Sequence, residues 1–451
     1  MARKFGVSAH NLAGRLATIV LITAAFPSNA GVAFFARMAP AVTSVNYDFT
    51  ASGASLPFQL TLTRATTATY VNSSGLIATA ATNTARIDFD PTTLAQKGLL
   101  MEPAATNQIR YNQDMTNAVW TVDSLNLSTV TSPDGTSNAN FLQENTANNV
   151  HKIYQDPVSS TAGNTVTISA FIKNSGKQKM RFQVMDATAY SNGITMNIDL
   201  STNSINSISA YGNGSLNSSS VTAYPSGWYR YTMTGVVSTT QANALVQFEL
   251  LNNSWSAPYT GDGSSGIYVW GTQFEIGTRA SSVIPTTSAA VTRNADQVTF
   301  NTMTWFNQPA GTLLAQFIDI GSYSGLNYRV FSLSNTNAGG TFAQNEIFIG
   351  DNGTTNTSGV TTASSAVFAP AGAVAAAGSV NKIALSYQAN NFAYSINGGA
   401  AITDTSGALP SPAYGYIGSQ PDGNMRPRWI QKIRYWPNTT SSAALAAIST
   451  P

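Results

Sequence analysis

The sequence predicts an all-β protein with two β-sandwich (jelly-roll) domains behind a distinct N-terminal segment. Only 9% of its 451 residues are charged, whereas 43% are hydrophobic. Ser, Thr, Asn and Gly stand between the apolar positions, and these residues suit strands and turns better than helix interiors. Apolar residues alternate with period two between turn signals, and no long amphipathic helix pattern competes with them.

Composition also restricts the kinds of partner and site. The formal net charge is +2, and without a dense basic arm we expect no nucleic-acid partner. The chain has no cysteine, which excludes disulfides and thiolate metal sites. Its only histidines are His10 and His151, which disfavours a multi-histidine metal centre.

Residues 1–46 differ from the rest of the chain. Basic residues up to Arg15 precede the apolar run 16–26, and small residues follow at Ser28 and Ala30. This order fits a secretory signal peptide, and the run is too short to predict membrane insertion. An apolar segment that stays on the protein needs a partner surface, so the alternative is a docking element buried in a larger assembly. We favour the docking segment.

The chain from residue 47 onward divides into three expected parts. Short strands over 47–111, with an Asn-Ser-Ser-Gly turn at 72–75, predict a small β collar or linker module. Longer strands over 112–300 predict a jelly roll, and those over 301–451 a second sandwich with one short C-terminal helix. No short repeat is present, which disfavours a β-helix.

The inward faces of the 112–300 sandwich can be read from the alternation. They are Val166, Ile168, Ala170 and Ile172; Met180, Phe182 and Val184; and Val246, Phe248 and Leu250.

The segment GIYVWGTQFEIG (266–277) carries apolar residues on both of its faces, which predicts a central strand covered on both sides. Strict alternation puts Tyr268, Trp270 and Phe274 on one face, with Trp270 in the core.

Several stretches resemble a known family. DFTASGASLPFQLTLTRATTATYVNSSG (from Asp48), KGLLMEPAATNQIRYNQDMTNAVW, PSGWYRYTMTG and YTGDGSSGIYVWGTQFEIG resemble a module of tailed-bacteriophage and prophage head-fibre, spike or tail-fibre proteins. There the module precedes a carbohydrate-binding-module-like jelly roll, and the resemblance covers roughly residues 47–300. NKIALSYQANNFAYSINGG and IQKIRYWP are similar to concanavalin A-like or laminin-G-like lectin sandwiches.

This resemblance implies a structural protein at the virion surface that serves in host attachment. Its N-terminus would dock to capsid or tail proteins of a phage-like particle, and its sandwiches would bind host surface polysaccharide. It also implies a homo-oligomer, with a trimer favoured, and a structural role for Trp228 in PSGWYRY. Weak single sites would then gain affinity through multivalency.

Two loops carry the residue types that hold sugars. Trp255 and Tyr259 lie among Asn, Ser and Pro, and a second loop carries Asp186, Tyr190 and Asn192. Aromatic rings pack on the C–H faces of saccharides, while amides and carboxylates pair with their hydroxyls. The alternative for Trp255 is a cap on the sandwich or a subunit contact.

Two further polar patterns have a simple structural interpretation, which we favour. Asp262 and Glu275 could share a structural calcium ion, but an Asp in a turn usually binds its own backbone. Arg428, Lys432 and Arg434 form a basic stripe on one strand face, which is typically solvated. The expected cofactor is therefore none, apart from that possible calcium.

Catalytic patterns are absent from the sequence. Glycoside hydrolysis needs two carboxyl groups flanking one bond, and Asp88 with Asp90 is the only close acidic pair. With no nucleophile elbow or phosphate loop, we predict that the protein is not an enzyme. A structural decoration protein, a polysaccharide depolymerase and a secreted adhesin remain the alternatives.

Overall fold

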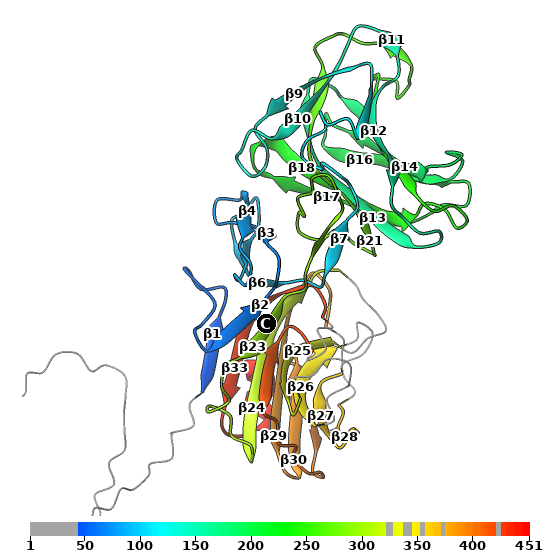
Figure 1. Ribbon diagram of the computed structural model, residues 1–451. Helices are drawn as coiled ribbons and strands as arrows, with labels where there is room; N and C mark the ends of the chain where they lie inside the picture. The colour runs from blue at the N-terminus through cyan, green and yellow to red at the C-terminus, as the bar shows by residue number, and fades with distance from the viewer. Residues whose placement is uncertain (1–43, 322–327, 337–344, 352–356, 371–374, 421–424) are drawn as a thin grey trace, which may run out of the picture. The chain divides into compact units, whose positions relative to one another are not determined.

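A computed structural model describes residues 44–321, 328–336, 345–351, 357–370, 375–420 and 425–451 (Figure 1). These residues form β-sheets throughout and a single α-helix, α1 (Ser442–Ile448), so the all-β prediction is confirmed. The predicted docking segment 1–46 lies almost wholly outside the described residues. Within the described residues, no helix has the length and apolar character needed to cross a membrane.

Residues 120–276 form one β-sandwich, here called the inserted sandwich, from two six-stranded antiparallel sheets. In spatial order, sheet 3 consists of β16 (Ser204–Tyr211), β15 (Gly193–Asp199), β14 (Lys179–Asp186), β19 (Ala244–Leu251), β12 (His151–Val158) and β8 (Trp120–Asp123). Sheet 4 consists of β17 (Ser215–Tyr224), β18 (Trp228–Val236), β13 (Thr165–Ser175), β21 (Gly266–Ile276), β10 (Ala139–Glu144) and β9 (Leu125–Val130). A short pair, β11 (Asn148–Asn149) and β20 (Tyr259–Thr260), extends beside them.

The core of the inserted sandwich lies between these two sheets. All the inward residues predicted on 166–172, 180–184 and 246–250 are buried in it, which confirms the period-two assignment. The rings of Phe182 and Phe248 stack at a centroid distance of 4.5 Å across the β14–β19 pair. The alternation fixes which side chains remain on the outer faces.

Strand β21 departs from strict alternation at a β-bulge. Its register with β13 shifts between the pairs Ser169–Gln273 and Phe171–Trp270. Gly271 lies in this shift with φ of +61°, a conformation that costs an L-residue roughly 1–2 kcal/mol. Trp270 therefore faces outward while Phe274 enters the core between the sheets, so their predicted common face is wrong. The prediction that the strand is covered on both sides is confirmed.

Around β13, β18 and β21, the outer face of sheet 4 carries a second apolar layer. Trp270 and Trp228 are 1% and 2% exposed, as predicted for structural residues. They pack with Val71 and Ile77 from the hairpin of β3 (Ala68–Val71) and β4 (Ile77–Ala80). An outward-facing indole is thus covered by a hairpin from an earlier part of the chain.

A second sandwich, here called the composite sandwich, combines residues from both ends of the chain. Sheet 1 consists of β31 (Ile402–Asp404), β30 (Asn391–Ile396), β29 (Val380–Gln388), β24 (Ala310–Asp319), β33 (Arg428–Trp436), β6 (Gln96–Met101) and β5 (Ile87–Phe89), with β1 (Val45–Asp48) also paired to β33. Sheet 2 consists of β2 (Leu60–Thr63), β23 (Gln297–Phe300), β32 (Tyr414–Ile417), β25 (Tyr328–Ser334), β26 (Glu346–Asp351), β27 (Gly359–Thr362) and β28 (Ser365–Phe368).

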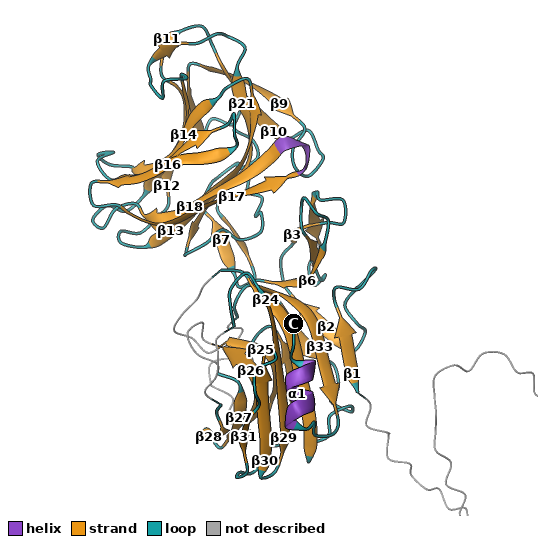
Figure 2. Cartoon of the chain, turned by 180° about the vertical axis from the view of Figure 1, so that it is seen from behind, coloured by secondary structure: helices purple, strands orange, loops and turns teal. Residues whose placement is uncertain are grey.

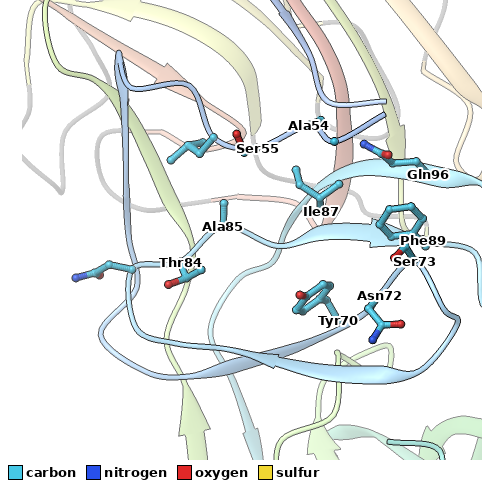
Figure 3. A pocket seen from close by; sticks show the side chains of 13 residues that line it. Ala54, Ser55, Tyr70, Asn72, Ser73, Thr84, Ala85, Ile87, Phe89 and Gln96 are labelled. Atoms are coloured by element: carbon cyan, nitrogen blue, oxygen red, sulfur yellow. The ribbon is translucent and has the colours of Figure 1, made fainter. Parts of the chain in front are cut away.

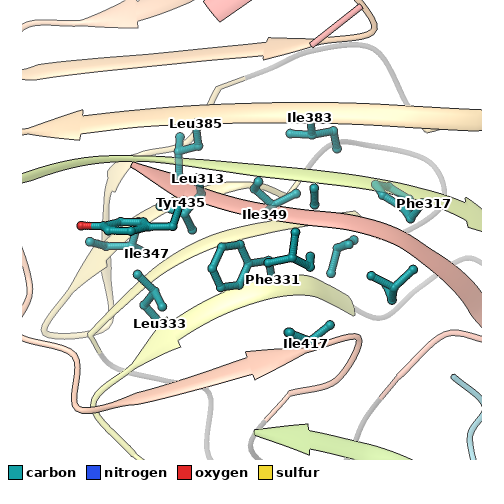
Figure 4. Close-up of a cluster of buried hydrophobic side chains, with 14 of the residues drawn as sticks. Leu313, Phe317, Phe331, Leu333, Ile347, Ile349, Ile383, Leu385, Ile417 and Tyr435 are labelled. Atoms are coloured by element: carbon teal, nitrogen blue, oxygen red, sulfur yellow. The ribbon is translucent and has the colours of Figure 1, made fainter. Parts of the chain in front are cut away.

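The composite sandwich changes the expected division of the chain. Strands β2, β5 and β6 lie in the predicted 47–111 module, and β1 overlaps its start. Yet β1 and β6 pair with β33 of the C-terminal part, β2 pairs with β23, and β5 joins sheet 1 through β6. Their apolar residues, such as Leu62 and Leu99, share a core with Phe331 and Ile383. Figure 4 shows the C-terminal part of this core as side chains that meet between the sheets. The chain leaves this sandwich after residue 101 and returns to it at residue 297, with β7 (Ala105–Asn107) paired to β22 (Val291–Arg293) on the way.

Helix α1 confirms the predicted C-terminal helix. Ser441 caps it by accepting a hydrogen bond from the Ala444 N–H. Its buried Leu445 packs on Leu314, Ala384 and Ala393 of sheet 1, and Figure 2 shows the helix lying along these strands.

A register shift in β33 divides the predicted basic stripe. The β24–β33 pairing shifts between Gln316 and Phe317, which changes the face of the residues before it. Arg428 therefore points inward and is 0% exposed, beside Asp319 at 3.2 Å. Lys432 and Arg434 remain half-buried, where Lys432 pairs with Asp48 and Arg434 donates to Asn46. A continuous basic stripe does not form.

Candidate functional site

The outer face of sheet 3 carries a row of uncharged polar side chains. Because Phe182, Val184, Val246 and Phe248 point into the core, their strand neighbours Gln183 and Gln247 point outward. The strand register places Gln183 directly opposite Gln247, which in turn lies opposite Tyr154 of β12. Thr195 of β15 and Thr121 of β8 continue the row on either side.

This face is hollowed where β12, β19 and β14 meet. A cavity of about 370 Å³ is lined by Tyr154, Gln183 and Gln247, together with Lys152, Met185, Tyr190, Leu245 and Glu249. Tyr190 is 50% exposed and stands at one end, where its hydroxyl donates to Asp156 Oδ2 at 3.1 Å. Two tyrosines and two amides therefore surround one open space.

The charged groups on this face are matched by opposite charges. Arg181 Nη1 lies 3.0 Å from Glu249 Oε2, and Lys152 Nζ lies 3.6 Å from Asp123 Oδ2. Lys179 pairs with Asp199 farther along β14 and β15. A ligand on this face therefore meets amides, hydroxyls and rings without a field of one sign.

Trp255 lies near the other end of the same face. It is half-buried, and Lys179 Nζ lies 4.9 Å from the centroid of its ring. Lys179 and Met185 mark the two ends of the outward row on β14, six residues or roughly 20 Å apart. Tyr190 and Trp255, both predicted as sugar contacts, thus belong to opposite ends of one sheet face.

Asp186 and Asn192 hold the loop that carries Tyr190. The Asp186 carboxylate is fully buried and accepts backbone N–H groups from Thr188, Ala189, Ser191 and others at 2.8–3.2 Å. Burial alone raises the pKa of Asp186, but these donors outweigh it and leave the pKa lowered. The Asn192 amide also donates to this carboxylate. Both side chains are engaged within the loop, and their predicted sugar contacts stay predictions.

Tyr259 is packed into the sandwich instead of forming an open platform. Its ring lies 4.7 Å from the His151 ring, and Lys177 Nζ lies 4.1 Å from its centroid. Its hydroxyl donates to Glu144, and burial together with this bond raises the pKa of Tyr259. Its ring and its hydroxyl both have partners within the protein, and its predicted sugar contact stays a prediction.

The predicted calcium pair does not come together. Asp262 precedes β21 and Glu275 lies at its other end, so the strand separates them by roughly 30 Å. Asp262 accepts the N–H groups of Ser264 and Ser265 at 2.7 and 2.6 Å, as expected for a turn. Glu275 accepts the Ser281 N–H and hydroxyl. In the described part of the chain, no three His, Asp or Glu side chains are grouped to hold a metal ion.

The acidic pair Asp88 and Asp90 is also divided. A register shift between Asp88 and Phe89 interrupts β5. Asp88 is 6% exposed, whereas Asp90 accepts N–H groups of the following turn and pairs with Lys97 at 3.3 Å. The two carboxyl groups therefore face different surroundings and do not flank a common space.

Tyr154, Gln183 and Gln247 form the floor of the sheet 3 hollow, and none of them was among the site residues predicted from the sequence. A signal for two of them was present, because assigning Phe182 and Phe248 inward assigns Gln183 and Gln247 outward. The order of strands in the sheet was not readable, and it is this order that places β12 and its Tyr154 beside β19.

Comparisons with known proteins assign no family. No protein-family model matches the sequence, and no curated protein does either. Solved structures with a similar arrangement include the sialidase of Trypanosoma rangeli in complex with the inhibitor DANA, at 10% identity and a TM-score of 0.27. That match covers 69% of this chain and 60% of the sialidase chain, so this chain spans less than two thirds of its length.

Two other similar structures are not sialidases. Domains LG4-5 of the mouse laminin alpha1 chain match at 11% identity and a TM-score of 0.23, covering 67% of this chain and 92% of that chain. The tandem CBM22 domains of Paenibacillus barcinonensis Xyn10C match at 10% identity and a TM-score of 0.22, covering 76% and 98%.

These comparisons correct one prediction. We predicted that the protein is not an enzyme, and the sialidases among the similar structures contradict that prediction. At these TM-scores the likeness assigns neither a reaction nor a substrate to this chain.

Proposed function

We propose that this protein binds uncharged glycans on the outer face of sheet 3. The observation that carries the proposal is the 370 Å³ hollow in which Tyr154 and Tyr190 accompany the amides of Gln183 and Gln247. Gln183 and Gln247 are 9% and 5% exposed, and their amide nitrogens donate to Met185 and Glu249. Each amide keeps a second N–H and an oxygen, which suit neighbouring sugar hydroxyls. The tyrosine rings offer flat surfaces for the C–H face of a pyranose.

The charge pattern supports an uncharged ligand. The ion pairs Arg181–Glu249 and Lys152–Asp123 leave no surplus cation to attract an acidic polysaccharide. Trp255, about 20 Å along the face, would contact a chain of several sugar units but not a monosaccharide seated at Tyr190.

The resemblance to head-fibre, spike and tail-fibre proteins supports a place for this activity. On that basis the chain is a surface fibre or spike of a phage-like particle, docked through its N-terminal segment and oligomeric. Several copies of a weak site would then act together on host surface glycans. A decoration protein or a secreted adhesin would carry the same fold. Unlike a fibre, a decoration protein would bind no glycan, and a secreted adhesin would not be attached to a particle.

A glycan array followed by titration calorimetry tests the proposal. We expect the full chain to bind neutral glycans and Tyr154→Ala/Tyr190→Ala to weaken that binding at least tenfold, because both rings are lost. Tyr414→Ala is the matched control, since Tyr414 is 39% exposed on sheet 2. Unchanged affinity in the double variant would reject this site. Release of reducing ends from the bound glycan would show catalysis in addition to binding.

A further inference from the structure

A second and larger hollow lies within residues 53–96, far in sequence from sheet 3. Its volume is about 500 Å³, and its walls are the loop at 53–56, the end of the β3 strand, the segment 83–89 and Gln96. Every wall belongs to this one stretch of the chain. No Asp, Glu, Lys, Arg or His lines it, so the hollow carries no formal charge.

Aromatic side chains form part of the wall. Tyr70 and Phe89 are half-buried, and Ile87 and Leu56 add aliphatic surface. Figure 3 shows Tyr70, Ile87 and Phe89 grouped together, with Asn72 and Gln96 beside them. Half-buried rings in a concave site are available to pack against the face of a ligand.

Two amides of the wall are held in fixed orientations by backbone groups. Gln96 Nε2 donates to the Phe49 and Ala51 carbonyls at 2.7 and 3.0 Å, which leaves Oε1 as an acceptor. Asn72 Oδ1 accepts the N–H groups of Ser74 and Leu76 at 2.9 and 3.1 Å, which leaves Nδ2 as a donor. A fixed acceptor and a fixed donor cost little entropy when a ligand binds.

We propose that this hollow is a separate binding site for an uncharged mono- or disaccharide. A hydroxyl-rich ring matches the donor, the acceptor and the aromatic wall together. A purely apolar ligand would desolvate both amides without pairing them, and a charged ligand would find no counter-charge. No residue of the sheet 3 face lines this hollow, so this proposal can be tested independently of the proposed function.

The experiment isolates this hollow in the full chain. The starting protein, called the background, is the Tyr154→Ala/Tyr190→Ala variant, which is expected to weaken binding at the sheet 3 face. Glucose, galactose, N-acetylglucosamine and their disaccharides are titrated into it by calorimetry. We expect one residual site per chain for at least one probe. Thr84→Trp blocks the hollow, because Thr84 is exposed and lines it, and residual affinity should fall at least tenfold. Thr82→Trp is the matched control, because Thr82 is also exposed and lies outside the lining.

A second pair of variants tests the aromatic wall. Tyr70→Ala should weaken residual binding at least tenfold, whereas Tyr70→Phe keeps the ring and should retain most of it. Near-ultraviolet circular dichroism confirms that each variant is folded. No residual binding to any probe, or equal binding by Thr84→Trp and Thr82→Trp, overturns the proposal. Undiminished binding by the Tyr154→Ala/Tyr190→Ala background would instead reject the sheet 3 site alone.

Discussion

The buried surroundings of the Asp88 carboxyl group destabilise its charged form. It is 6% exposed, and burial raises its pKa to about 6, although the Val71 N–H and the Trp429 indole N–H both donate to it. These two bonds tie β5 to the hairpin strand β3 and to β33. The carboxyl therefore joins three segments that are distant in sequence, and it is less stable as an anion there than in the unfolded chain.

Asp88 should make the protein more stable in mild acid. Because its folded pKa is raised above the ordinary value of 3.8, the folded state binds more protons than the unfolded state between about pH 4 and pH 6. The free energy of unfolding should therefore fall by about 3 kcal/mol from this group as pH rises through that window. In Asp88→Asn that contribution disappears. Urea denaturation at pH 4 and pH 6.5 measures the difference between the two proteins, and identical pH profiles would contradict the assignment.

Strand β21 illustrates how one element serves two hydrophobic layers. Its first half sends Ile267 and Val269 into the core of the inserted sandwich and Trp270 into the layer under the β3–β4 hairpin. The bulge at Gly271 then allows Phe274 to enter the core. The Trp270 indole N–H also donates to Asn138 Oδ1 at 2.8 Å, so its polar end is satisfied. Strand β21 is consequently covered on both faces.

The two tryptophans of this region should respond differently to truncation. Trp270→Ala should lower the free energy of unfolding by about 3–5 kcal/mol, because it opens a cavity under the hairpin. Trp255→Ala should cost less than about 1 kcal/mol, because Trp255 is a half-buried loop residue. Urea denaturation of both variants measures this contrast. Equal losses would mean that Trp255 is a structural cap.

A buried network of charged side chains connects segments that are distant in the sequence. The Asp296 carboxylate forms ion pairs with Arg64 Nη1 at 2.8 Å and with Arg86 Nη2 at 2.5 Å. Arg86 Nη1 also pairs with Glu102 Oε2 at 2.6 Å. Glu102 in turn accepts the Ser282 N–H at 2.9 Å. These groups are buried, and they connect residues 64–102 with residues 282–296. The shared sheets make the two ends of the chain one folding unit. Removing one partner of the buried network would leave an uncompensated charge.

Fragments should reveal this shared dependence. Residues 301–451 alone lack β1, β2, β5, β6 and β23, so their exposed sheet edges and open core should leave them unfolded. Residues 44–107 joined to 291–451 by a short Gly-Ser linker should fold, because β7 and β22 already bring residues 107 and 291 together. Dispersion of amide signals in NMR spectra distinguishes the two outcomes. A folded 301–451 fragment would contradict the composite sandwich.

Particular residues show how far sequence reasoning reached. Period-two alternation correctly placed Phe182 and Phe248 in the core, because a strand in a two-sheet sandwich repeats its environment every second residue. The same rule failed at Phe274 and Arg428, because a register shift adds a residue that alternation does not count. Of the predicted sugar contacts, Tyr190 and Trp255 stay predictions, while Asp186, Asn192 and Tyr259 are engaged within the protein.

The sequence by itself determined the class of fold, the inward faces of the long strands and the C-terminal helix. Each of these follows from local spacing, since burial alternates along a strand regardless of its neighbours. Only the tertiary structure decided which strands are adjacent, and therefore that Tyr154, Gln183 and Gln247 form one row and that β1 and β33 share a sheet. Pairing between distant segments depends on hydrogen bonds and packing in three dimensions, which no local pattern encodes.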